Sequence, residues 1–247
     1  MSHDTELLIR SAELAEQSYG NVAGALKFEN KRTDTTCFVL QTTNCDYVIW
    51  RGTESKRDWL YNLLFIPRPV QKAWIHMGFY RAQQGVWKDV RKVLTPAKKT
   101  VQIGHSLGGA CAEISCLLSR EFQKLHLITF GKPNTFARFR KCRMDHLKTQ
   151  YSVVHGSDIV ARIPRVGYRP STGTNLLQLW FANNGVDFIN PGVKIKKQDW
   201  KVGESVSDHM MSGYQARMAA FCQKQDEPEL GSPRSRKRKK RRKGKKG

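Results

Sequence analysis

The sequence predicts an α/β fold in which helices flank a mostly parallel or mixed β-sheet. Apolar, strand-like runs alternate with helix-like segments along most of the 247 residues. Midway, the strand-like run 100–103 leads through a glycine-rich turn at 104–108 into apolar residues at helical spacing. The length suits one sizeable core, so we expect one domain over residues 1–225 and a disordered linker and basic tail over 226–247.

The first half of the chain follows the order helix, two strands, helix. Asp4 can cap a first helix that ends near Gly20 and carries its apolar residues on one side. The strand-like runs 36–40 and 46–50 are separated by a short polar turn, which predicts a hairpin. A second helix is predicted from about 80 to 94, because valines recur on one side and charged residues on the other.

The second half continues the alternation. A helix follows the central turn, and buried-type strands follow at 125–130 and 151–155. Between those strands, a polar, arginine-rich stretch through Met144 is predicted to be helical. A hairpin around Asn-Asn-Gly at 183–185 and a last helix to about Gln223 complete the predicted order.

The turn at 104–108 has the pattern of a nucleophile elbow. In that device a serine sits on a sharp turn between a strand and a helix, and glycines stand two residues to either side because a larger side chain would collide there. Here the serine is Ser106, flanked by Gly104 and Gly108. Because a strand-like run precedes the turn and helical spacing follows it, we interpret Ser106 as a catalytic nucleophile.

A serine hydroxyl needs a base to take its proton and an acid to hold that base. In hydrolases with such an elbow, the acid and then the histidine follow the serine along the chain. His209 is the preferred base, because among the later histidines it lies well beyond an acid that ends a strand. Asp158 follows the apolar strand 151–155 and is the preferred acid, with Asp187 in reserve.

The oxyanion of a tetrahedral intermediate also needs hydrogen-bond donors. The backbone N–H of Leu107, next to the serine, is one candidate. A second donor should come from a loop after an early strand, and the Arg-Gly-Thr loop at 51–53 is such a loop. Thr53 offers both an N–H and a hydroxyl, so we predict an oxyanion hole formed by Thr53 and Leu107.

Six short blocks stand in a fixed order between about Glu6 and Phe221. They are Arg51-Gly52-Thr53 with Asp58-Trp59 and Asn62, His76 with Gly78-Phe79, Gly104 to Ala110, Thr129-Phe130-Gly131 with Pro133, Val153 to His155 with Asp158 to Val160, and Asp208-His209. Together these blocks resemble the class 3 lipases, the fungal-lipase-like branch of the α/β-hydrolases. The resemblance implies an α/β-hydrolase fold and hydrolysis of lipid esters without a metal or other cofactor.

The resemblance also implies roles for individual residues. It implies the same triad of serine, aspartate and histidine that the residues indicate on their own. It further implies a lid near residues 56–60, whereas composition alone favours ordinary core there, because exposing so many large apolar groups is costly. The residues assigned to the lid and to substrate binding are Trp59, Leu60, His76 and His105.

The sequence departs from the family in two respects. Ala161 stands where the family often has proline, which is expected to loosen the loop that carries the acid. Secreted fungal members carry signal peptides and disulfides, whereas the start of this chain contains acids and no apolar run, and its six cysteines lack paired metal spacing. We therefore expect reduced cysteines and an intracellular protein, cytoplasmic and, through the basic tail, also nuclear.

The formal charge of +22 is unevenly distributed. Residues 234–246 carry 11 lysines and arginines, and without them 32 basic residues still face 21 acidic ones, a charge of +11. The body should therefore be attracted to anionic membranes and to nucleic acid. We expect a peripheral protein whose substrate is a lipid ester at a membrane or droplet surface. Nuclear import factors, nucleic acid and anionic lipid are the candidate partners of the tail, in that order.

These observations predict a serine hydrolase that cleaves acylglycerol-type carboxylic esters of lipids through an acyl-enzyme. A phospholipase acting on anionic membranes is the first alternative, because the body is basic. The second alternative belongs to a different class: a catalytically inactive hydrolase scaffold that binds or tethers through its basic tail.

Overall fold

The computed structural model describes residues 3–53, 66–156, 158–164, 166–182, 185–189 and 209–226. Trp59 and Leu60 of the predicted lid lie outside these described residues, as does the basic tail. The lid assigned to Trp59 and Leu60 and the roles assigned to the tail stay predictions.

The core is an eight-stranded sheet with the order β1-β2-β3-β6-β7-β9-β11-β12. Its strands are β1 (Leu26–Asn30), β2 (Thr35–Gln41), β3 (Cys45–Trp50), β6 (Lys99–His105), β7 (Lys124–Phe130), β9 (Thr149–His155), β11 (Leu176–Ala182) and β12 (Gly185–Ile189). From β3 to β11 the neighbouring strands are parallel, and the pairs at the two edges are antiparallel. The predicted α/β fold with a mixed, mostly parallel sheet is confirmed, and so are both predicted hairpins.

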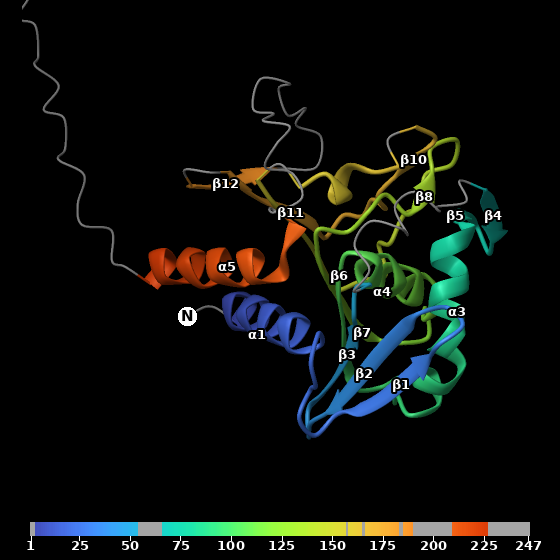
Figure 1. Cartoon of the computed structure of the whole chain (residues 1–247), viewed down its shortest axis with the longest axis horizontal. Helices are drawn as coiled ribbons and strands as arrows, with labels where there is room; N and C mark the ends of the chain where they lie inside the picture. The colour runs from blue at the N-terminus through green and yellow to red at the C-terminus, as the bar shows by residue number, and fades with distance from the viewer. Residues whose placement is uncertain are drawn as a thin grey trace, which may run out of the picture.

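Helices cover both faces of this sheet (Figure 1). On one face, α1 (His3–Gln17) packs beside α5 (Met211–Asp226). On the other face lie α3 (Met77–Lys92) and α4 (Leu107–Leu118). Within the described residues, no helix combines the length and the apolar character that crossing a bilayer requires.

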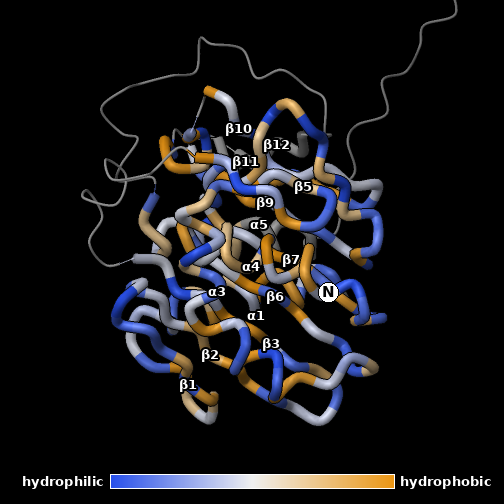
Figure 2. Tube along the Cα trace, turned by 90° about the vertical axis from the view of Figure 1, so that its right-hand side faces the viewer, coloured by the Kyte–Doolittle hydropathy of each residue, from blue (hydrophilic) through white to orange (hydrophobic). Residues whose placement is uncertain are grey.

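Strand pleating divides the apolar side chains between the two faces. Leu127 of β7 contributes to the cluster under α3 and α4, whereas the next residue, Ile128, contributes to the cluster under α1 and α5. In Figure 2 hydrophobic colouring is prominent along central strands such as β3 and β7, and many connecting turns are hydrophilic. The described cysteines are free and buried: Cys37, Cys45, Cys111, Cys116 and Cys142.

A second, four-stranded sheet was not predicted from the sequence. Its order is β10-β8-β5-β4, formed by Tyr168–Arg169, Phe136–Ala137, Ala73–His76 and Pro67–Val70. Pro67 and Pro69 lie in β4, at the edge of this sheet, where the N–H that proline lacks is not needed for pairing.

The helix predicted through Met144 is wrong. Phe136 and Ala137 form β8 instead, which pairs with β5 and β10. The buried apolar side chains of this stretch are Phe136, Ala137, Cys142 and Met144, and this spacing does not place them on one side of a helix. Tertiary pairing therefore overrides a composition that suits a helix surface.

A buried ion pair ties α4 to the segment after β7. Lys132 Nζ lies 2.8 Å from Glu113 Oε2, and both side chains are almost fully buried. The other carboxylate oxygen of Glu113 accepts hydrogen bonds from the hydroxyl and the N–H of Ser171. Because both charged groups are removed from water, each depends on its partner for compensation.

Replacing Glu113 by glutamine should lower the free energy of unfolding by about 3 kcal/mol or more, because Lys132 would remain buried without a counter-charge. Urea unfolding measures this change. The exposed pair of Arg91 and Glu121 provides the control: Glu121→Gln should change stability by less than about 1 kcal/mol. Similar losses in both variants would contradict a special role for the buried pair.

Candidate active site

Neighbouring parallel strands bring the predicted site residues to one edge of the sheet. The loop 51–53 follows β3, Ser106 follows β6, and Asp158 comes three residues after β9. The register of strand pairing aligns the carboxyl ends of β3, β6 and β7, since Trp50 pairs with Gly104 and His105 pairs with Phe130. In open α/β sheets this carboxyl edge is where ligands bind.

Ser106 occupies a strained turn between β6 and α4. Its φ of 57° and ψ of −129° are unusual for a residue with a side chain, and such a conformation costs about 1–3 kcal/mol. The flanking glycines make the turn possible: a Cβ at Gly104 would overlap the backbone of Gly108, and a Cβ at Gly108 would overlap the carbonyl of Trp50. Ser106 is the N-terminal cap residue of α4, but its side chain makes no capping hydrogen bond.

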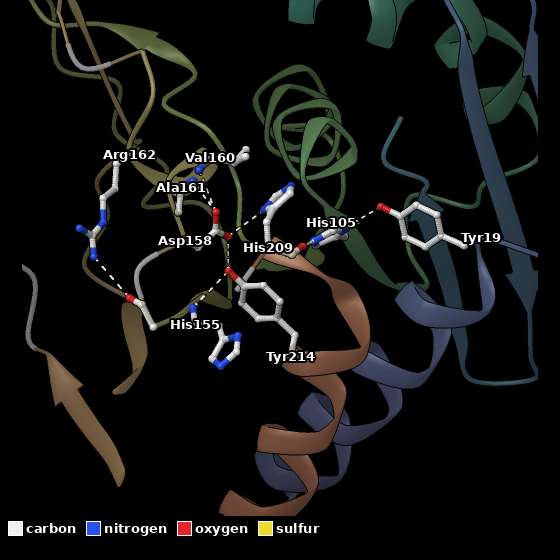
Figure 3. A network of polar contacts seen from close by, with 10 residues as sticks. Tyr19, His105, His155, Asp158, Val160, Ala161, Arg162, His209 and Tyr214 are labelled. Carbon is white, nitrogen blue, oxygen red and sulfur yellow. Dashed lines mark hydrogen bonds and ion pairs between the residues drawn. The ribbon is translucent and has the colours of Figure 1, made fainter. Parts of the chain in front are cut away.

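Asp158 and His209 form a hydrogen-bonded pair. His209 Nδ1 lies 2.8 Å from Asp158 Oδ2 (Figure 3). Because a carboxylate only accepts hydrogen bonds, Nδ1 must carry the proton, and in a neutral ring Nε2 then carries the lone pair. This is the tautomer that a general base requires. Asp158, and not the reserve candidate Asp187, is thus the acid bonded to this histidine.

The Asp158 carboxylate is fully buried and accepts further hydrogen bonds. Its Oδ2 also accepts from the hydroxyl of Tyr214, and its Oδ1 accepts from the N–H groups of Val160 at 2.8 Å and Ala161 at 3.4 Å. Proline at position 161 would lack that N–H. The departure from the family at Ala161 therefore adds a donor to the acid, where the sequence suggested a looser loop.

Gly131, directly after β7, leaves room for this cluster. Its φ is +54°, and a Cβ there would lie 2.5 Å from Asp158 Oδ2, 2.8 Å from the hydroxyl of Tyr214 and 3.0 Å from His209 Nδ1. A side chain would meet all three polar partners at once.

His105 lies behind His209. The two rings stack with centroids 4.7 Å apart, and His105 Nε2 lies 2.8 Å from the carbonyl oxygen of His209. Since a carbonyl accepts, Nε2 donates, and Nδ1 can accept from the hydroxyl of Tyr19. His105, assigned to substrate binding from the sequence, thus supports the backbone and the ring of His209.

Of the two residues predicted to form the oxyanion hole, Leu107 directly follows Ser106 in the chain, and Thr53 belongs to the loop that approaches it. Leu107 is the first residue of α4, where an N–H has no partner within the helix. Thr53 presents a buried hydroxyl that has no hydrogen-bond partner among the described residues. The same loop approaches the nucleophile closely, because a Cβ on Gly52 would lie 3.2 Å from Ser106 Cβ.

His76, the other histidine assigned to the lid and substrate region, is fully buried. Its Nδ1 accepts from the N–H of Phe79 and so caps α3, and its ring stacks on Phe79 at 4.2 Å. Burial lowers the pKa of His76 to about 4. These contacts give His76 a role in the structure of α3.

Comparison with known proteins identifies the family. Residues 47–168 match the family of class 3 lipases. The chain belongs to the class 3 lipase family. A secreted mono- and diacylglycerol lipase of Fusarium solani is 32% identical over 48% of this chain and 40% of its own length. The chain spans about two fifths of the length of the curated relatives it matches.

Solved lipase structures have a similar fold over most of this chain. A triacylglyceride lipase from Rhizomucor miehei superposes with a TM-score of 0.66 at 20% identity, covering 85% of this chain and 94% of that chain. A triacylglycerol lipase whose catalytic centre is formed by a serine protease triad gives a TM-score of 0.66 at 21% identity, with the same coverage. The α/β-hydrolase architecture implied by the sequence blocks is therefore shared with fungal lipases.

Three residues of this class 3 lipase site were missed in the sequence. Tyr214 and Tyr19 are single tyrosines in helical or turn segments, and nothing local marks them as partners of Asp158 or His105. Gly131 ends a strand, and the turn signal was visible, but the crowding that requires glycine depends on three other segments. Within the described part of the chain, no group of three or more His, Cys, Asp or Glu residues is arranged to hold a metal ion.

Replacing Gly131 by alanine should reduce ester hydrolysis by about a hundredfold, because displacement of Asp158 and His209 by even 1 Å disrupts the reacting geometry. The matched control is Gly24→Ala. Gly24 also has a positive φ, of +74°, but its Cβ would meet only Leu40, at 3.9 Å. Steady-state rates and circular dichroism of both variants separate the local clash from the backbone strain they share, and equal rate losses would contradict this prediction.

Stability should fall as the pH drops from 6.5 to about 4. In this range the unfolded chain protonates residue 76 while the folded chain keeps His76 neutral, so protons favour unfolding. The expected loss from His76 is about 3 kcal/mol. Asparagine can cap a helix without titrating, so urea unfolding of His76→Asn should show a flatter pH dependence; an unchanged slope would exclude His76 as the cause.

Proposed function

We propose that this chain is a serine hydrolase that cleaves acylglycerol-type esters of lipids through an acyl-enzyme on Ser106. One observation carries the proposal: His209 donates from Nδ1 to the buried carboxylate of Asp158, at the sheet edge where the strained elbow presents Ser106. Family membership supports the class of reaction. Acylglycerols are the substrates that the names of the relatives give, and a serine protease triad forms the catalytic centre of one of them.

In the first half-reaction, His209 Nε2 takes the proton of the Ser106 hydroxyl while Oγ attacks the ester carbonyl carbon. The bond between that carbon and the alcohol oxygen then breaks, and His209 returns its proton to the leaving alcohol. Asp158 stabilises the imidazolium that exists between these two proton transfers. The N–H of Leu107 and the donors of Thr53 stabilise the oxyanion.

In the second half-reaction, His209 takes a proton from water, and the resulting nucleophile attacks the acyl carbon. The bond to Ser106 Oγ breaks, the serine recovers its proton, and the fatty acid is released. These steps require no redox group and no co-reactant other than water.

Replacing Ser106 by alanine should lower hydrolysis of a soluble p-nitrophenyl ester by more than about a thousandfold, because the nucleophile is lost and the fold is not. A fluorophosphonate probe should label the unmodified chain and not the variant. Ser119→Ala, at the far end of α4, is the control and should keep both activity and labelling. Labelling that persists in Ser106→Ala would place the nucleophile elsewhere, and an unlabelled, inactive native chain would support the tethering alternative.

A further inference from the structure

A cavity of about 330 Å³ lies where the end of α1 meets the start of α5. Its described lining residues are Glu16, Tyr19, His105, His209, Met210, Met211 and Ser212. Figure 3 shows Tyr19, His105 and His209 in a row across this junction. The cavity is therefore bordered by the proposed base, whereas the described lining includes neither Ser106 nor the loop 51–53.

This position fits one side of the substrate. In the proposed reaction the acyl carbon becomes attached to Ser106, and the oxyanion points toward Leu107 and Thr53. The alcohol oxygen, in contrast, must lie against His209, from which it receives its proton. A cavity bordered by the base but not by the nucleophile is thus placed for the leaving alcohol, and the acyl chain lies elsewhere.

The described lining of the cavity contains an acidic side chain, Glu16, although the chain as a whole is basic. Glu16 is partly buried, and its carboxylate has no hydrogen-bond or ion-pair partner among the described residues. His105 has both ring nitrogens engaged, one with the carbonyl of His209 and one with Tyr19. The Glu16 carboxylate is therefore the acidic group of the described lining, although the formal charge of the chain is +22.

We propose that this cavity receives the alcohol part of the ester and that Glu16 selects an uncharged glycerol group over a phosphate-bearing one. Hydroxyl groups of glycerol can donate to the Glu16 carboxylate and to Ser212, and Met210 and Met211 contact carbon. A phosphate at the same place would face a like charge at short range, with partial exclusion of water. The inference rests on the proposed function, since it assigns the proton of the leaving alcohol to His209.

The experiment compares 1-oleoylglycerol with 1-oleoylglycerol-3-phosphate, two esters with the same acyl chain, in micelles of an uncharged detergent at low ionic strength. The native chain should favour the uncharged ester by about tenfold or more. Glu16→Gln should narrow this ratio by about three- to tenfold, and Glu16→Lys should narrow it further. In the native chain, 0.5 M salt should lower the ratio as well, because Glu16 is only partly buried and added salt screens its repulsion of the phosphate.

Glu13→Gln is the matched control, because Glu13 lies one turn earlier on α1, outside the described lining of the cavity, and pairs with Arg10. It should leave the ratio unchanged. A ratio that is the same in the native chain and in both Glu16 variants would overturn the cavity assignment while leaving the proposed hydrolase intact. Failure of the native chain to hydrolyse either ester or to react with a fluorophosphonate would overturn both.

Discussion

The hydrogen bond between Asp158 and His209 is the interaction on which the rest of the site depends. It joins the end of β9 to the residues just before α5, 51 positions later in the chain. Burying a carboxylate is costly unless its oxygens accept hydrogen bonds, and here four donors surround it: His209, Tyr214, Val160 and Ala161. The packing of α5 on α1 and on the sheet is therefore also what keeps His209 in the tautomer that a general base requires.

Close packing also connects the Asp158–His209 pair to the turn that carries Ser106. Lys132 follows Gly131, which makes room for the pair, and forms the buried ion pair with Glu113 of α4. Lys132 also packs closely against the first turn of α4: a Cβ on Gly109 would lie only 2.9 Å from Lys132 Cβ. Ser106, Asp158 and His209 thus rest on one continuous set of contacts, and the conformational strain at Ser106 is maintained by the same contacts.

Local signals explain which parts were predictable from the sequence. Ser106 and Asp158 follow apolar strands, and strand ends can be recognised from hydrophobic runs that stop at glycine or polar residues. The order of serine, acid and histidine then singled out His209. By contrast, Tyr214 and Tyr19 act only through partners brought by tertiary packing, and β8 forms because β5 and β10 are available for pairing. Neither kind of information is contained in a short window of sequence.

The basic body and the acidic Glu16 have opposite charges, and we assign them different tasks: attraction to a membrane and selection of the ester. A positively charged body is attracted to anionic membranes through long-range fields that depend little on detailed geometry. In the proposed cavity, selection of the scissile ester depends instead on a single carboxylate, that of Glu16, which lines the same cavity as His209, whereas distant lysines are screened by salt. With these two features, an enzyme of this kind can reside on a surface rich in anionic phospholipid and still draw its substrates from the uncharged acylglycerols dissolved in it. Under this proposal the basic composition, which on its own favours a phospholipase of anionic membranes, contributes to docking, and the choice of ester is made by the cavity beside His209.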